Sequence, residues 1–162
     1  MPQLGKQGAP CKMSPPMARL PDRFDLWLRQ AREKADPARQ LDYVLGALCC
    51  LPYWHFVNIG TAESPLPGQT RGGELLFVYS DAGRIEELEP EVGIISIPFP
   101  AAMTWVLERG SGLLVNHEVV IPFTSLQAYE REWRARGERQ ASGFWIPNMT
   151  TEEEDFWQEH GL

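Results

Sequence analysis

The sequence predicts an α+β fold in which helices cover a mixed sheet of about five strands, with two helices before the sheet and a helical tail after it. Segments with the periodicity of amphipathic helices alternate with short apolar segments rich in β-branched and aromatic residues. The chain has 162 residues, about the length of one domain. Its 43% hydrophobic and 23% charged residues are close to the average for globular proteins, so a single core is expected.

The chain divides into three parts. Residues 1–20 are rich in proline, glycine and small polar residues, and they hold too few apolar side chains to offset the entropy of ordering. A flexible segment is therefore expected there. Residues 21–137 are expected to form one α+β domain, and residues 138–162 an irregular segment followed by an acidic C-terminal helix.

Two helices are expected before the sheet. The first, over residues 22–35, has four apolar residues at the spacing of one helix face, namely Phe24, Trp27, Leu28 and Ala31. Asp36 and Pro37 then favour a second start, because Asp is a good N-cap and the missing N–H of Pro is harmless in the first turn. This second helix is expected to end before Pro52.

Apolar and β-branched runs predict five strands, over residues 53–59, 74–79, 93–97, 113–116 and 119–121. Residues 60–73, between the first two strands, form a long loop rich in Pro and Gly, which we expect to be mobile or functional. Short helices are expected after Ser80 or Asp81 and over residues 101–109. A turn or bulge at His117 separates the last two strands.

Two pairs of residues have the spacing of a capping box. Thr124 and Gln127 predict the start of a helix that Gly137 closes. Thr151 and Glu154 predict the start of the C-terminal helix, where neighbouring acidic residues suit the positive end of the helix dipole.

The formal net charge is −7, from 22 Asp and Glu against 15 Lys and Arg. No basic stripe with interleaved aromatic residues occurs, and a negative surface repels phosphate. Nucleic acid and membranes are therefore not expected as partners. The sequence shows neither a secretory signal nor an apolar run long enough to span a bilayer, so a cytoplasmic location of bacterial type is expected.

The three cysteines, Cys11, Cys49 and Cys50, do not suggest a disulfide framework. Adjacent helical side chains point about 100° apart, so Cys49 and Cys50 are expected to be small buried hydrophobic residues. His55 alone does not complete a metal site with them. The sequence has no metal-ligand spacing and no nucleotide-binding motif, so neither a metal nor a cofactor is expected.

Asn116, His117 and Glu118 form the best polar cluster of the sequence, at the end of a predicted strand. The cluster is either a turn or part of a pocket. His55 lies among aromatic residues of a strand, where a histidine with structural hydrogen bonds is expected more often than a catalytic one. Nucleophilic catalysis needs a nucleophile, a base and an orienting group that converge, and no such set stands out, so no catalytic residue is assigned.

Tryptophan is abundant, with six residues in the chain. Trp133, Trp145 and Trp157 fall in the last helices or in the tail. Aromatic residues at such positions either bind another protein or pack the helices onto the sheet. The tail is accordingly expected either to dock back onto the domain or to engage a partner.

Three blocks occur in a distinctive order in the middle of the chain. They are Glu-Leu-Leu-Phe-Val-Tyr-Ser-Asp-Ala-Gly-Arg-Ile-Glu-Glu-Leu at residues 74–88, Ile-Ser-Ile-Pro-Phe-Pro-Ala-Ala-Met at 95–103, and Gly-Leu-Leu-Val-Asn at 112–116 with the segment 119–126. In this order they resemble the amino-terminal domain of the bacterial SseB-like protein family. The likeness covers residues 57–129, and the chain departs from the family pattern at His117 and Glu118. The resemblance implies a compact α+β domain, usually intracellular, without established catalytic residues.

These observations favour a non-catalytic intracellular module that binds another protein, with the Trp-bearing helices and the loop over residues 60–73 as candidate contact surfaces. The alternative is a small-ligand receptor or an enzyme with a pocket near Asn116, His117 and Glu118. A third hypothesis is an immunity or adaptor role in a toxin or secretion system, since an acidic domain suits a basic partner. Homo-oligomerisation stays open.

Overall fold

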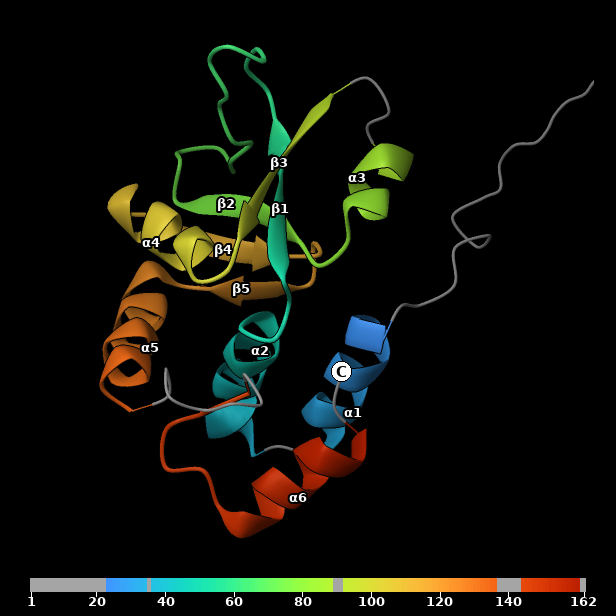
Figure 1. Cartoon of the computed structure of the whole chain (residues 1–162), viewed down its shortest axis with the longest axis vertical. Helices are drawn as coiled ribbons and strands as arrows, with labels where there is room; N and C mark the ends of the chain where they lie inside the picture. The colour runs from blue at the N-terminus through green and yellow to red at the C-terminus, as the bar shows by residue number, and fades with distance from the viewer. Residues whose placement is uncertain (1–22, 35, 89–91, 137–143, 161–162) are drawn as a thin grey trace, which may run out of the picture.

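The computed structural model describes residues 23–34, 36–88, 92–136 and 144–160 (Figure 1). The predicted flexible segment 1–20, Gly137 and residues 138–143 of the predicted irregular segment lie outside these ranges. The predicted α+β class is confirmed, with a mixed sheet of five strands, two helices before it and a helix after it. None of the helices in the described ranges has the length and hydrophobicity that a membrane span requires.

The two helices before the sheet lie close to their predicted positions. Helix α1 (Arg23–Lys34) buries the four apolar residues of its predicted face. Pro37–Arg39 form a single 3₁₀ turn, η3, and helix α2 follows over Gln40–Leu48. Asp36 is the N-cap as predicted, but its side chain makes no capping hydrogen bond. Its carbonyl instead accepts the N–H of Arg39 at 2.7 Å, so the second helix begins with one tight turn.

The sheet has the strand order β3-β1-β2-β4-β5. Its strands are β1 (Tyr53–Asn58), β2 (Leu75–Tyr79), β3 (Gly93–Pro98), β4 (Gly112–Val115) and β5 (Val119–Ile121). Neighbouring strands are antiparallel except β2 and β4, which run parallel. Consequently β3 and β5 are the edge strands, and the carboxyl ends of β2 and β4 lie side by side.

The two faces of the sheet are covered unequally (Figure 1). The helices that cross them are α3 (Ala82–Leu88), α4 (Ala101–Glu108) and α5 (Phe123–Ala135). Side chains alternate along a strand, so Trp54 and Phe56 point into the main core, which also includes buried side chains of α1, α2, α4 and α5. Val57 points to the opposite face, where Ile85 of the short helix α3 covers a small second cluster.

The helix predicted to open at Ser125, with Thr124 and Gln127 as its capping box, starts two residues earlier. Helix α5 begins at Phe123 with Pro122 as its N-cap, and no side chain makes a capping hydrogen bond there. The carbonyl of Pro122 accepts the N–H of Leu126 at 3.0 Å. The predicted capping box is therefore wrong, because the chain turns directly from β5 into the helix and Thr124 already lies in its first turn.

The capping box of helix α6 (Thr151–His160) lies at Thr150 and Glu153, one residue before the predicted pair. The N–H of Glu153 donates to Thr150 Oγ1 at 3.1 Å, and the N–H of Thr150 donates to Glu153 Oε1 at 2.9 Å. Arg39 of η3 binds the same carboxylate, which fixes Glu153 as the acid of the box.

The tail of the chain, residues 144–160, docks back onto the helices. Phe144, Trp145, Ile146 and Trp157 belong to the buried main core. Gly46 of α2 makes this approach possible, because a Cβ there would lie 2.6 Å from the ring of Phe144 and 3.1 Å from Ile146. Figure 1 shows α6 below α1 and α2, at the opposite end of the molecule from the loop between β1 and β2.

The loop between β1 and β2 is ordered by hydrogen bonds within itself and to β1. Asn58 Oδ1 accepts the N–H groups of Gly60 and of Leu66, each at 2.9 Å. The N–H of Gly68 donates to the carbonyl of Val57 at 2.9 Å. The loop thus extends the hairpin beyond the sheet and carries its tip away from α2 and α6 (Figure 1).

Candidate functional site

Polar side chains gather at the carboxyl ends of β2 and β4, the parallel pair of strands. Asn116, after β4, is 7% exposed and connects the two strand ends. Its Oδ1 accepts the N–H of Ser80 at 3.0 Å, and its Nδ2 donates to Ser80 Oγ at 3.1 Å. Ligand sites in sheets with parallel strands occur preferentially at this end. Both polar groups of the Asn116 side chain are used in hydrogen bonds that join the two strand ends.

The turn that follows β4 places His117 over the second face of the sheet. Asn116 and His117 have φ angles of 52° and 61°, and the N–H of Glu118 donates to the carbonyl of Val115 at 2.8 Å. Two successive positive φ angles are the pattern of a type I′ turn, in which glycine is preferred at the second position. Holding a histidine there costs about 1 kcal/mol.

Contacts of the His117 ring offset that cost. Its Nε2 shares a hydrogen bond of 2.6 Å with the hydroxyl of Tyr79, and its ring lies 5.4 Å from the ring of Phe77 between centroids. Tyr79 is 4% exposed, whereas His117 is exposed to solvent. The turn therefore holds one imidazole at the surface, anchored to a buried phenol.

A second histidine lies on the same face of the sheet. His55 is the direct cross-strand neighbour of both Ser96 and Tyr79, and its Nδ1 shares a hydrogen bond of 2.7 Å with Ser96 Oγ. Burial lowers the pKa of His55, while the negative charge of Asp81 acts in the opposite direction. Ser96, His55, Tyr79 and His117 thus form a polar row across the sheet.

Two cavities lie near the sheet and its helices. One cavity, of about 210 Å³, lies between α1, α2 and β5, and its lining includes Arg32 and Glu118. Their ion pair is long, at 3.5 Å, and both side chains are about half exposed, so it contributes little. The other, of about 300 Å³, lies between α2 and α5 and includes Asp42. Neither cavity is lined by His117, so of the predicted polar site only Glu118 borders one of these two.

The two thiols that follow α2 have the character of buried side chains. Cys49 is buried and Cys50 is partly buried, and neither forms a disulfide. Burial raises the pKa of both thiols, that of Cys50 to about 12. Within the described ranges, no three His, Cys, Asp or Glu side chains are placed to hold a metal ion.

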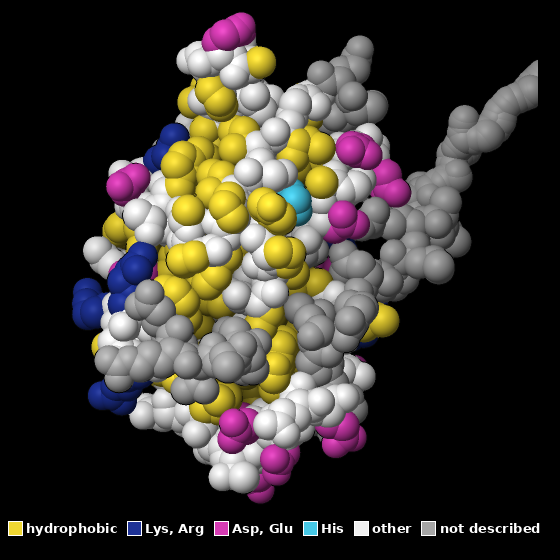
Figure 2. Space-filling model, viewed as in Figure 1, with side chains coloured by type: hydrophobic (Ala, Val, Ile, Leu, Met, Phe, Trp, Pro, Cys, Tyr) yellow, Lys and Arg dark blue, Asp and Glu magenta, His cyan; other side chains and the backbone are white. Residues whose placement is uncertain are grey.

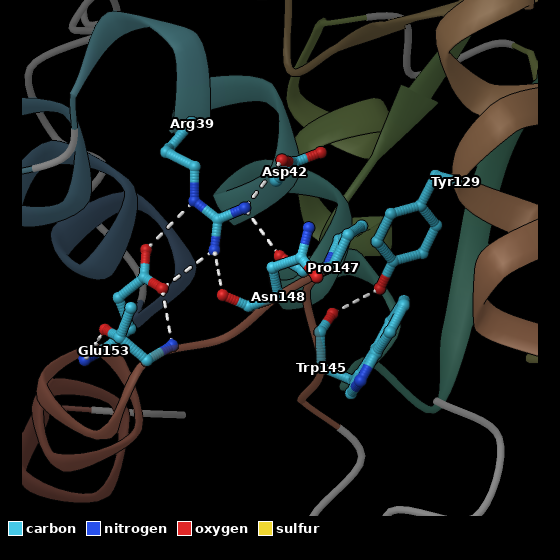
Figure 3. Close-up of polar contacts among 8 residues, drawn as sticks. Arg39, Asp42, Tyr129, Trp145, Pro147, Asn148 and Glu153 are labelled. Atoms are coloured by element: carbon cyan, nitrogen blue, oxygen red, sulfur yellow. Dashed lines mark hydrogen bonds and ion pairs between the residues drawn. The ribbon is translucent and has the colours of Figure 1, made fainter. Parts of the chain in front are cut away.

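The three tryptophans predicted as candidate partner-binding residues are buried. Trp133, Trp145 and Trp157 are 5%, 6% and 8% exposed. The ring of Trp157 stacks on that of Phe144 at 4.0 Å between centroids, and the carbonyl of Trp145 accepts the hydroxyl of Tyr129 at 2.6 Å (Figure 3). These contacts agree with the alternative that the tryptophans pack the helices and the tail onto the rest of the fold. Partner binding by these rings stays a prediction that requires them to leave the core.

The surface along β1 and β3 exposes other apolar side chains, of which only Leu66 lies in a segment that the sequence predicted as a contact surface, the loop over residues 60–73. Tyr53, Ile59 and Leu66 are 48%, 57% and 53% exposed. Beside them lie four partly buried side chains of both sheet faces: Ile94 packs on the second cluster, and Ile95, Ile97 and Phe99 pack on the main core. We call these seven residues the β1–β3 surface. Figure 2 shows hydrophobic side chains gathered over β1 and β3, with acidic side chains toward α3 and α6.

The sequence signal for this surface is the run Gly93–Pro98, whose isoleucines point to both sides of the strand. Such a run also fits a strand buried on both faces. Only the strand order, which puts β3 at an edge, shows that its side chains are left partly exposed.

Comparison of the chain with protein-family models, with curated proteins and with solved structures found no match.

Proposed function

We propose that the protein is a non-catalytic module that binds another protein, and that the β1–β3 surface is its docking surface. The SseB-like resemblance and the cytoplasmic location belong to this proposal. The observation that carries it is the exposure of three large apolar side chains, Tyr53, Ile59 and Leu66, along one strand and the loop that follows it. Single exposed apolar residues are ordinary on a protein surface, whereas a group of them is typical of an interface.

The edge position of β3 indicates the form of the partner. Within the described ranges no strand pairs with the outer side of β3, so its main-chain groups are open to an added strand. An extended segment of another protein that pairs there would place alternate side chains against Ile95 and Ile97 on one side and Ile94 on the other. Pro98 ends the strand and limits the added pairing to the residues before it.

Charge gives a second property of the partner. Figure 2 shows acidic side chains at the tip of the loop, to which Glu63 belongs, and toward α3, to which Glu86 and Glu87 belong, whereas Lys and Arg side chains lie on the side of α4 and α5. A segment with Lys or Arg flanking an apolar centre complements this arrangement. The proposed partner is therefore an apolar, extended segment with basic flanks.

Site-specific photo-crosslinking in cells of the source organism tests the proposal. A photo-reactive amino acid placed at position 53 is expected to capture one defined partner. The same amino acid at position 26 is the matched control, because Leu26 of α1 is 47% exposed but lies outside the β1–β3 surface. Capture should weaken as salt is raised, and Leu66→Ser should reduce it. Equal capture from positions 53 and 26, or none from either, would refute the proposal.

The alternative of a small-ligand receptor or an enzyme also has an observation in its favour. Ser96 Oγ lies 2.7 Å from His55 Nδ1, with the charge of Asp81 near the imidazole. A hydroxyl, a base and an acid are the components of nucleophilic catalysis. Labelling of Ser96 by a fluorophosphonate, abolished in His55→Gln, would favour this alternative, and an unlabelled wild-type chain would exclude a serine-hydrolase mechanism.

A further inference from the structure

The surface of the helices on which the tail packs has the properties of a peptide-binding groove. Its walls come from four helical segments: Trp27 of α1, Arg39 of η3, Tyr43 and Gly46 of α2, and Tyr129 of α5. We call these five residues the tail groove. In this structure the groove is occupied by residues 144–157 of the same chain (Figure 3).

The groove recognises the main chain of its occupant. Arg39 Nη1 donates to the carbonyl of Pro147 at 2.6 Å, and Nη2 donates to that of Asn148 at 3.5 Å. The hydroxyl of Tyr129 donates to the carbonyl of Trp145 at 2.6 Å. Carbonyl groups are common to every peptide, so these contacts hold the backbone through the turn at Pro147 and Asn148 and leave the choice of side chain to the rest of the groove.

A carboxylate is the first side-chain requirement. The guanidinium of Arg39 binds Glu153 through two hydrogen bonds, Nε to Oε2 at 3.1 Å and Nη2 to Oε1 at 2.8 Å (Figure 3). The planar fork of arginine matches a carboxylate in this two-point geometry.

Aromatic rings are the second requirement. Gly46 leaves space that the ring of Phe144 fills. Trp27 and Tyr43 stack with centroids 5.9 Å apart, and the edge of Trp27 meets Trp157 at 5.0 Å. An occupant with aromatic side chains before and after its acidic residue therefore fits.

The tail does not satisfy the groove completely. Trp27 is 1% exposed, and its indole N–H has no hydrogen-bond acceptor among the described residues. A buried donor without an acceptor is unfavourable, and an occupant that offers a carbonyl or carboxylate to it would be bound better than the tail in this respect. This unmet donor is independent of the Arg39 contacts.

From these contacts we infer that the tail groove is a second binding site, for an acidic, aromatic segment of another protein that forms a turn followed by a helix, as the tail does, and takes the place of the tail. The inference goes beyond the β1–β3 surface and does not depend on it. The tail, being part of the same chain, competes with a high effective concentration. A segment added from outside therefore gains access mainly when the contact of Glu153 with Arg39 is weakened.

Fluorescence anisotropy with the full chain tests the inference. The probe is a fluorescein-labelled synthetic peptide of residues 144–160. It is expected to bind the Glu153→Gln chain at least about tenfold more tightly than the wild type, because the variant tail loses its two-point ion pair. Glu152→Gln is the matched control, since Glu152 is an exposed neighbour on the same turn, and it should bind like the wild type. A probe carrying Glu153→Lys should bind none of the chains.

Near-ultraviolet circular dichroism establishes that each chain is folded, and Thr150→Val, which removes one half of the capping box, serves as a milder second variant. Probe binding that is equal in, or absent from, folded wild type, Glu153→Gln and Thr150→Val would overturn the inference. Light scattering that shows a dimer formed by exchanged tails would overturn the choice of another protein as the occupant.

Discussion

The tail and the β1–β3 surface use similar side chains in opposite ways. In the tail, Phe144 is 2% exposed and its ring lies between those of Tyr43, Trp27 and Trp157. On the β1–β3 surface, Tyr53 is 48% exposed, and its ring meets that of His55 at 6.3 Å. The tail thus buries its aromatic area within the chain, whereas the β1–β3 surface leaves apolar area exposed to solvent.

This difference shows that a place near the end of the chain says little about exposure. Trp157 lies five residues before the last residue and is buried, because Arg39 and Gly46 of the helical region receive the tail. Tyr53 is exposed, because it lies on the second face of the sheet, where the cluster covered by α3 includes Val57, Tyr79 and Ile85 but not Tyr53. Exposure follows from the topology of the fold, which brings distant segments together.

The comparison is tested most strongly by removing one ring from each region. Phe144→Ala is expected to lower the free energy of unfolding by about 3–5 kcal/mol, because the buried ring leaves a cavity. Tyr53→Ser is expected to change it by less than about 0.5 kcal/mol, since that ring is half exposed. Chemical denaturation followed by circular dichroism measures both. Losses of similar size would contradict the division between the two regions.

The next effect concerns the space that α2 leaves for the tail. Gly46→Val is expected to lower the free energy of unfolding by about 2–3 kcal/mol, because its side chain would collide with Phe144 and Ile146. Gly46→Ala should act in the same direction but less, since alanine also favours the helix by about 1 kcal/mol. A thermal unfolding curve that is unchanged in Gly46→Val would show that the tail is not seated against this glycine.

A smaller effect is expected from the Arg39–Glu153 ion pair, and it depends on pH. Burial alone would raise the pKa of Glu153, but the hydrogen bonds from Arg39 and Thr150 and the charge of Arg39 lower it below its ordinary value of 4.5. The pair therefore stabilises the fold fully above about pH 4.5, and the stabilisation is lost as the pH falls through the folded-state pKa.

Accordingly, Glu153→Gln is expected to lower the free energy of unfolding by about 1.5 kcal/mol at pH 7, and the difference from wild type should shrink below pH 4.5. Urea titrations at several pH values measure this difference, with Glu152→Gln as the control that should show none. A difference that stays constant down to low pH would mean that the carboxylate charge is not what holds the tail.

The smallest expected effect belongs to the other region, at His55. Burial lowers its pKa below the ordinary 6.5, with the charge of Asp81 opposing this, so the unfolded chain binds a proton more readily than the folded one. Stability is then highest above pH 6.5 and declines as the pH falls toward the folded-state pKa. His55→Gln should flatten this part of the pH profile. A decline of the same size in the variant would assign the effect to other groups.

Much of the fold could be predicted from local patterns. The spacing of Phe24, Trp27 and Leu28 gave the buried face of α1, and Asp36 was correctly expected as an N-cap. The capping box of α6 was predicted one residue too late, because Thr150 and Thr151 are both followed by an acidic residue three positions later. Only the contact with Arg39 selects the pair Thr150–Glu153.

The candidate sites were harder to predict, because they depend on strand order and on contacts between distant residues. Asn116 and His117 were recognised as a turn with polar groups, but nothing in the sequence indicated that His117 would meet Tyr79, which lies 38 residues earlier. The pairing of His55 with Ser96 likewise follows from the register of β1 and β3. The exposure of Tyr53 could be known only from the packing of α3, which covers Val57 and Tyr79 on that face and leaves Tyr53 uncovered.

Parallel measurement of folding stability and partner capture on the same two variants, Phe144→Ala and Tyr53→Ser, tests the central claim most directly. The claim predicts that Phe144→Ala unfolds at a clearly lower denaturant concentration than the wild type. Tyr53→Ser is expected to unfold at the same concentration as the wild type but to lose the partner that is captured from position 53. A Tyr53→Ser chain that retains this partner as well as the wild type does would contradict the assignment of the β1–β3 surface as the docking surface.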